Sequence, residues 1–212
     1  MARVKAFELF AMDMPFKKVF KHAAADRSTS YSLMLKCIAE SGHIGFGECL
    51  PRDYVTGETR DGTFELLQKH ILPRLIGKDF DSVEDLKAFL IQNNGKAPEE
   101  WVTPTQPQTA AWAAVDLALL DACGHAFNEP IRLSDHPGLD PKFRYSVVFS
   151  AEKGFKAFKL LTMIRLFGFH QAKLKIEKDT ATDTARLARR ILGRKCDIRI
   201  DANMAWDVPQ AI

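Results

Sequence analysis

The sequence predicts an α+β domain followed by three βα units that share a parallel sheet. Strand-like segments with partial alternation crowd the first 50 residues, which is typical of an antiparallel meander. From Phe143 onward, short apolar runs alternate with helical stretches, and residues 146, 175 and 201 of successive units are 29 and 26 residues apart. Repeats of this length are βα units, whose strands must pair in parallel.

The amino-terminal strands are predicted from β-branched and aromatic residues at residues 2–12, 30–40 and 43–49. Ser41-Gly42 forms the turn between the second and third strands. A long polar loop, residues 13–29, joins the first two, and a second loop with Pro51 at its start runs to Thr59.

Helical periodicity follows. The predicted helices cover residues 60–71, ending before Pro73, then residues 81–92 and 108–126. Asp81-Ser82 begins the second of these, with Asp85 at the capping-box position. We therefore expect an α+β domain over residues 1–130 and a linker over 131–142.

The remaining residues, 143–212, hold the βα units. Strands are predicted at 143–150, 169–176 and 196–201, helices at 151–167 and 179–192, and a further helix opening at Pro209. Ile198-Arg199-Ile200 has the apolar character of a buried parallel strand.

Composition excludes several classes of protein. The chain has 212 residues, 46% of them hydrophobic, and a net charge of +3 without a basic cluster interleaved with aromatics, so we expect no nucleic-acid partner. Charges within the apolar stretch 110–127 predict a buried helix and no membrane span. The N-terminus shows no signal peptide. Four scattered cysteines predict buried thiols and a reducing, cytoplasmic location.

Lys173 and Lys175 are the first candidates for chemistry. Residues i and i+2 of a strand point to one face, so both ammonium groups lie together. Their repulsion and burial favour the neutral amine that a general base requires. The alternative is a surface strand with two solvated lysines.

Asp201 ends the next apolar strand. At such a position its carboxylate can bind Mg²⁺, with Asn203 as a polar substrate contact or an outer partner of the site. The alternative is a helix N-cap, where Asp and Asn are favoured.

Other polar segments are weaker candidates. The loop at residues 52–59 carries Tyr54 and Thr56, and the long first loop carries Arg27, which could pair with a substrate carboxylate. The six histidines have no metal-ligand spacing, and Gly45-Phe46-Gly47 lacks the following helix of a phosphate loop.

In order and spacing, these motifs resemble the enolase superfamily, in its muconate-lactonizing-enzyme subgroup. The matching segments are GFGECLP at residues 45–51, TGET at 56–59, AAWAAVDLALLD at 110–121, Tyr145-Ser146, Lys173-Leu174-Lys175, and Asp201-Ala202-Asn203 with Trp206. Each is weak alone, but the ordered set covers nearly the whole chain.

The resemblance implies an α+β N-terminal capping domain followed by the first three βα units of a TIM-type (β/α) barrel. Capping loops near residues 15–30 and 50–59 would choose a small carboxylate substrate. Lys175 would remove a proton α to the carboxylate, with Lys173 beside it favouring the neutral amine. Asp201 would be the first of three Mg²⁺ ligands, and Ser146 and Arg27 would contact substrate.

The family also needs two further acidic ligands and an opposing base on later strands, and this sequence has none of them. We therefore expect a truncated chain that is inactive by itself. For the complete enzyme we expect an epimerase or racemase of a small carboxylate or dipeptide, which could be a homo-oligomer. The alternatives are an o-succinylbenzoate synthase or muconate cycloisomerase, and a non-catalytic remnant.

Overall fold

The computed structural model describes residues 1–22, 25–92, 95–103, 105–129, 144–150, 152, 154–175, 181–202 and 206–211. The chain divides into two compact units, and each is described by itself. Unit 1 comprises residues 1–19 and 27–135, and unit 2 comprises residues 20–26 and 136–212. The predicted linker, residues 131–142, lies outside the described residues.

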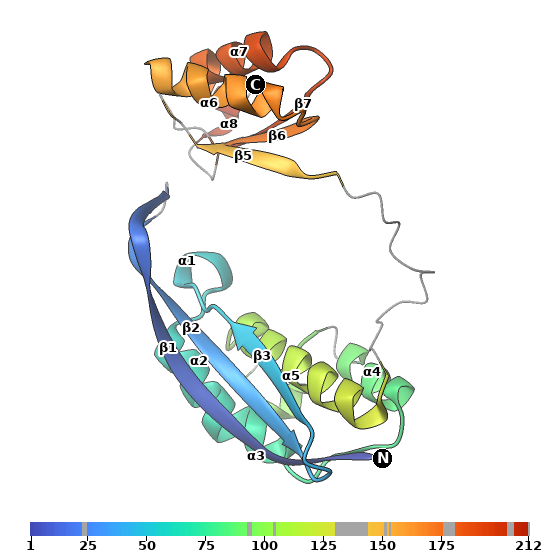
Figure 1. Ribbon diagram of the computed structural model, residues 1–212. Helices are drawn as coiled ribbons and strands as arrows, with labels where there is room; N and C mark the ends of the chain where they lie inside the picture. The colour runs from blue at the N-terminus through green and yellow to red at the C-terminus, as the bar shows by residue number, and fades with distance from the viewer. Residues whose placement is uncertain are drawn as a thin grey trace. The chain divides into compact units, whose positions relative to one another are not determined.

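Unit 1 is built on a four-stranded sheet in the order β3-β2-β1-β4 (Figure 1). The strands are β1 (Ala2–His22), β2 (Ala25–Ala39), β3 (Ile44–Cys49) and the short β4 (Asp79–Phe80). β2 and β3 pair antiparallel, with Leu33 opposite Cys49 and Ile38 opposite Ile44. The predicted antiparallel sheet is thus confirmed.

The prediction of a long loop over residues 13–29 is wrong. β1 continues to His22 and β2 begins at Ala25, so residues 13–22 and 25–29 extend the two strands. Asp13, Pro15 and Lys17 suggested a loop because polar residues and proline are rare inside sheets. β4 covers β1 only at Ala2 and Arg3, and a proline is tolerated on an open strand edge.

The helices of unit 1 lie on one face of this sheet (Figure 1). They are α1 (Asp53–Thr56), α2 (Arg60–Leu66), α3 (Leu72–Leu75), α4 (Val83–Ile91) and α5 (Thr109–Phe127), with a π-helical turn η1 (Leu67–Ile71) and a 3₁₀ turn η2 (Glu99–Trp101).

Two helix boundaries test the local predictions. The predicted cap is confirmed at α4, where the Asp85 amide donates to Ser82 Oγ (3.1 Å), and the Asp85 side chain accepts from the amide of Asp81, one residue before the N-cap (3.2 Å). The predicted end before Pro73 is wrong, because the helical path continues to Leu75. The wide turn η1 precedes Pro73, which then stands in the first turn of α3, where a missing N–H costs little.

The long helix α5 packs directly on β3. A Cβ atom on Gly45 would overlap the backbone of Ala118 and Ala122, and one on Gly47 would overlap that of Ala114 and Ala118. The glycine pair therefore permits contact between two backbones, which is a packing role for this motif.

By length and hydropathy, α5 is a helix that could cross a membrane. Half of its apolar stretch is nevertheless buried inside the structure, and Trp112, Val115 and Leu119 belong to the core of unit 1. This matches the buried helix that the charges in the sequence predicted.

Unit 2 contains a three-stranded parallel sheet in the order β5-β6-β7. Its elements alternate as predicted: β5 (Ser146–Ser150), α6 (Gly154–Leu166), β6 (Gln171–Lys175), α7 (Ala181–Leu192), β7 (Asp197–Asp201) and α8 (Val208–Ala211). Three parallel βα units are therefore confirmed.

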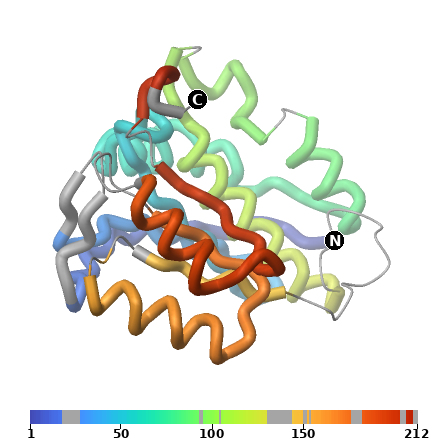
Figure 2. The backbone as a smooth tube through the Cα atoms, turned by 90° about the horizontal axis from the view of Figure 1, so that it is seen from above, coloured from blue at the N-terminus to red at the C-terminus, as the bar shows by residue number. Residues whose placement is uncertain are grey.

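One face of this sheet is covered by α6 and α7, which run side by side (Figures 1 and 2). Phe149, Ala172 and Leu174 of the strands pack against Leu161 and Ala188 of the helices in a second core. Residues at the alternate strand positions consequently lie on the other face.

Candidate active site

At the carboxyl ends of the parallel strands, Ser150, Lys175 and Asp201 occupy neighbouring positions on β5, β6 and β7. Ser150 pairs with Lys175, and Lys175 pairs with Asp201, so these backbone positions are neighbours across the sheet. Leu174 is fully buried toward the helices, while Lys173 and Lys175 are half-buried on the opposite face. The predicted sharing of one face by the two lysines agrees with this register.

Asp201 is joined to the lysine pair by an ion pair. Lys173 Nζ lies 2.7 Å from Asp201 Oδ2, with side chains 33% and 26% exposed. The contact is diagonal, because the register places Arg199 opposite Lys173 and Asp201 opposite Lys175. Two of the predicted site residues are thus in contact, and the third, Lys175, lies on the same strand as Lys173, directly opposite Asp201.

Two other predicted residues do not join this cluster within the described part of the chain. Asn203 lies outside the described residues. Ser146 pairs with Gln171 at the start of β5, four residues from Ser150, which is about 13 Å along a strand. Its predicted contact with substrate remains a prediction.

The remaining candidates, Arg27, Tyr54 and Thr56, belong to other elements. Arg27 lies in β2, and its side chain is outside the described residues. Tyr54 and Thr56 are half-buried on α1, a single turn inside the predicted loop, and Thr56 Oγ1 donates to the Arg52 carbonyl (3.3 Å). Gly57 ends this turn with φ of 75°.

A cavity of 620 Å³ adjoins α1 and the start of α2. It is lined by Tyr31, Pro51, Arg52, Asp53, Glu58, Thr59, Arg60 and Asp61. Both charge signs are present, so the cavity could contact a zwitterionic ligand.

Glu58 is a structural residue that sequence reasoning missed. Its carboxylate is buried and accepts hydrogen bonds from the amides of Ala110 (2.8 Å) and Ala111 (3.0 Å) at the start of α5. A carboxylate there satisfies free N–H groups and complements the helix dipole. The absence of a capping side chain immediately before α5 was the available signal, since Gln108 does not cap the helix.

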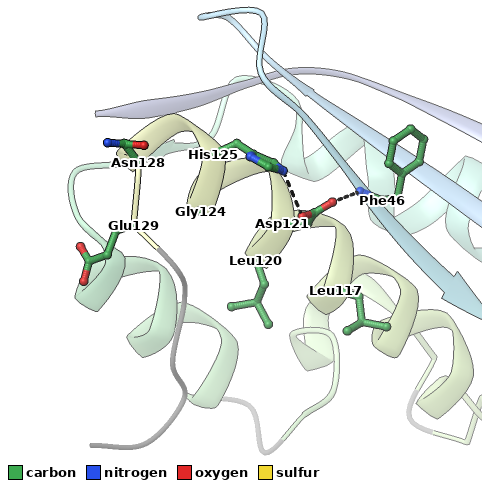
Figure 3. A pocket seen from close by; sticks show the side chains of 8 residues that line it. All are labelled: Phe46, Leu117, Leu120, Asp121, Gly124, His125, Asn128 and Glu129. Carbon is green, nitrogen blue, oxygen red and sulfur yellow. Dashed lines mark hydrogen bonds and ion pairs between the residues drawn. The ribbon is translucent and has the colours of Figure 1, made fainter. Parts of the chain in front are cut away.

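A second cavity of 630 Å³ lies where α5 meets the edge of the sheet (Figure 3). Asp121 lies between its partners there: Oδ2 accepts from the Phe46 amide (2.8 Å), and Oδ1 is 3.4 Å from His125 Nε2. The carboxylate satisfies an outward amide of the edge strand β3. An edge amide that already donates to a side chain is not available to pair with a strand of another chain.

Burial changes the pKa of several titratable groups that lie outside the lysine cluster. It raises the pKa of Cys37 and Cys49 to about 12 and that of Cys123 to about 11, and Glu58 adds to the effect at Cys49. Burial also raises the pKa of Asp116 on α5. All four cysteines are free and buried, as predicted, and these raised values make reactive thiolates unfavourable.

Magnesium fits the described residues poorly. Mg²⁺ needs several oxygen ligands, and among the residues that the structure describes no group of three or more His, Cys, Asp or Glu is suited to hold a metal. Asp201 is engaged by Lys173. These residues therefore do not build a complete magnesium site.

Comparison with known proteins gives one family match. Residues 6–133 match the family described as mandelate racemase / muconate lactonizing enzyme, N-terminal domain. The chain is 27% identical over 207 residues to the N-succinyl-L-Arg/Lys racemase of Bacillus cereus, covering 96% of this chain and 53% of the racemase. It is 26% identical over 212 residues to the L-Ala-D/L-Glu epimerase of Clostridium acetobutylicum, covering 99% and 56%.

The chain is also similar to a muconate cycloisomerase and to several solved structures. The chain is 25% identical to muconate cycloisomerase 1-1 of Acinetobacter lwoffii, covering 98% of this chain and 54% of that protein. The crystal structure of the B. cereus racemase superposes with a TM-score of 0.77 at 25% identity, covering 97% and 53%. The crystal structure of the Enterococcus faecalis dipeptide epimerase, complexed with Mg and the dipeptide L-Leu-L-Tyr, superposes with a TM-score of 0.73 at 23% sequence identity. The match covers 99% of this chain and 56% of the epimerase. The chain thus spans about half the length of the curated relatives it matches.

Proposed function

Because this chain belongs to the mandelate racemase / muconate lactonizing enzyme family, we propose that it forms part of an enzyme that removes the proton α to a carboxylate. The reaction is the epimerisation or racemisation of a small carboxylate such as a dipeptide. The observation that carries the proposal is the alignment of Lys175 with Asp201 across β6 and β7, with Lys173 paired to Asp201.

Lys175 is the proposed base. As a neutral amine it takes the α-proton, and the C–H electron pair moves toward the substrate carboxylate to give an enediolate. Lys173 sets the charge beside the base, and its pairing with Asp201 holds both side chains at the strand ends. Inversion further requires a proton donor on the opposite side of the substrate, which we assign to residues outside the described strands.

The proposed architecture follows the family. The three βα units form the first part of a TIM-type (β/α) barrel, and residues 1–130 form a domain that caps it. Asp201 is proposed as one ligand of a Mg²⁺ site whose other carboxylates lie outside the described residues. Substrate contacts are proposed for the β1–β2 hairpin with Arg27, for α1 with Tyr54 and Thr56, and for Ser146 and Asn203. A cytoplasmic homo-oligomer is the proposed form.

The test is α-proton exchange in D₂O, followed by proton NMR on the full-length gene product with L-Ala-L-Glu and N-succinyl-L-Arg as probes. Lys175→Ala should lower the exchange rate at least about 100-fold, since a positioned base contributes this much or more. Lys156→Ala, on the exposed side of α6, is the matched control and should exchange at the wild-type rate. Wild-type exchange in Lys175→Ala would refute the role of Lys175.

Cycloisomerisation is the second candidate function. The similarity to a muconate cycloisomerase favours it, because the same lysine pair can serve proton transfer at a carbon α to a carboxylate in either reaction. Conversion of cis,cis-muconate without α-proton exchange in L-Ala-L-Glu or N-succinyl-L-Arg would select this alternative.

A further inference from the structure

Arg60 connects three elements of unit 1 that are distant in sequence. Its Nη1 atom donates to Asp13 Oδ1 on β1 (2.6 Å), and its guanidinium carbon lies 5.3 Å from the ring centroid of Tyr31 on β2. Its Nε atom donates to Asp61 Oδ1 on α2 (3.3 Å). One side chain thus contacts both strands of the hairpin and the helix that follows α1.

The position of Arg60 is electrostatically unfavourable for its helix. Thr59 caps α2 and accepts from the Gly62 amide (3.2 Å), so Arg60 is the first residue of that helix. A cation at a helix N-terminus opposes the macrodipole. The carboxylates of Asp13 and Asp61 offset this charge, and the ring of Tyr31 adds a cation–π contact.

The neighbouring residue Glu58 anchors the same segment in the other direction. Its buried carboxylate is held by two amides of α5, two residues before Arg60. The segment is therefore fixed to the core by Glu58 and to the hairpin by Arg60. The 620 Å³ cavity lies at this junction and is lined by Tyr31, Glu58 and Arg60.

We propose that Arg60 is a positioning residue that fastens the β1–β2 hairpin to the α1–α2 segment and thereby sets the spacing of two substrate-selecting segments. This inference rests on the proposed function for the statement that both segments select substrate. Arg60 acts through Asp13 and Tyr31 and touches no reacting atom. Loss of the contact should loosen the hairpin and alter selectivity while leaving the lysine pair intact.

The first measurement is amide hydrogen exchange over residues 9–17 and 28–34. Arg60→Met should speed exchange there about five-fold, the size expected for one partly exposed ion pair with a cation–π contact, and Asp13→Asn, which keeps the contact with Tyr31, should speed it less. The double variant should exchange no faster than Arg60→Met, because that variant already removes the ion pair with Asp13. Arg60→Lys, which keeps the charge, should restore part of the protection.

Lys69→Met is the matched control. It removes the exposed ion pair between Lys69 and Glu65 on the same helical stretch and should leave exchange in the hairpin unchanged. Unchanged exchange in Arg60→Met, or equal acceleration in Lys69→Met, would overturn the fastening role.

The second measurement is the ratio of kcat/KM for L-Ala-L-Glu and L-Leu-L-Tyr in the full-length gene product. Arg60→Met should shift this ratio about three-fold or more through KM, as expected for a change in substrate positioning. A looser hairpin with an unchanged ratio would overturn the positioning role. If the wild-type protein exchanges no α-proton, the proposed function fails, while hydrogen exchange still decides whether Arg60 fastens the hairpin.

Discussion

Lys173 Nζ lies 2.7 Å from Asp201 Oδ2, so the acidic residue at the end of β7 is paired with a lysine of β6. The pair joins adjacent strands at the edge of the sheet where the chemistry is proposed. It also places a carboxylate beside the Lys173 ammonium, on the face of the sheet that Lys173 shares with Lys175. Charge at the strand ends is therefore partly balanced within this part of the chain.

Removal of the Lys173 amine should destabilise unit 2. Lys173→Met leaves Asp201 half-buried without this partner, and we expect a loss of about 1 kcal/mol in the free energy of unfolding by urea. Lys156→Met, which breaks the more exposed pair of Lys156 and Glu152, is the control and should cost less than about 0.5 kcal/mol. Equal losses in the two variants would show that the Lys173–Asp201 pair stabilises the protein no more than the exposed Lys156–Glu152 pair does.

Glu58 should be more important for stability than its loop position suggests. Glu58→Ala removes two hydrogen bonds to the start of α5, and the expected loss is about 2–3 kcal/mol. Glu48→Ala changes an exposed glutamate on nearby β3 and should cost under about 0.5 kcal/mol. Thermal and urea unfolding of both variants measure the difference. A loss at Glu58 no larger than that at Glu48 would contradict the capping role.

Substitution of the β3 glycines should disrupt unit 1. Gly47→Ala places a methyl group into the backbone of α5, where neither element can yield easily, so we expect a loss above about 3 kcal/mol. Phe46→Ala, an exposed position between the two glycines, is the control and should be tolerated. Folded yield and melting temperature distinguish them, and a stable Gly47→Ala protein would disprove the close packing of helix and strand.

Stability should fall in alkaline solution because of the buried thiols. The pKa of Cys37 and of Cys49 is raised to about 12 in the folded protein, so both stay protonated while an unfolded thiol, with an ordinary pKa near about 8.5, ionises. The unfolded state then binds fewer protons, and the free energy of unfolding decreases as the pH rises from about 8.5 toward 12.

The measurement for this prediction is urea unfolding between pH 7.5 and 10.5 under reducing conditions. Cys37→Ala should show a shallower decline than the wild type because one titrating thiol is removed. Identical slopes would mean that the thiol does not contribute.

Magnesium should have little effect on the 212-residue chain by itself. One carboxylate, already paired with Lys173, is a poor site for the ion. Calorimetric titration with MgCl₂ should give no saturable heat, and the chain alone should not exchange the α-proton of L-Ala-L-Glu. Saturable binding below about 1 mM would contradict this expectation, because it would require a more complete ligand set.

Regular spacing made the second half of the fold predictable. The intervals between residues 146, 175 and 201 predicted three parallel strands, and parity along β6 predicted that Lys173 and Lys175 share a face. The ion pair between Lys173 and Asp201 was not predicted, because spacing gives strand order but not the diagonal reach of a long side chain.

The first half was less predictable because its key contacts are long-range. Asp13 and Pro15 have a loop-like composition, yet they lie in a strand supported by β2 and fastened by Arg60. Glu58 resembles an ordinary loop glutamate until α5 is placed beside it. Local propensity is overridden at such positions by partners that are distant in sequence.

The glycine contact between β3 and α5 also sets the register of the strand along the helix. Two residues of strand advance by about 6.8 Å and four residues of helix by about 6.0 Å. The contact of Gly45 with Ala118 and Ala122 is therefore repeated, four helix residues earlier, by the contact of Gly47 with Ala114 and Ala118. A shift of one residue would replace a glycine by Ile44 or Phe46 and collide with the helix. The position of β3 along α5 is consequently fixed by the two glycines. The same contact fixes where the chain leaves β3 after Cys49 on its way to Glu58.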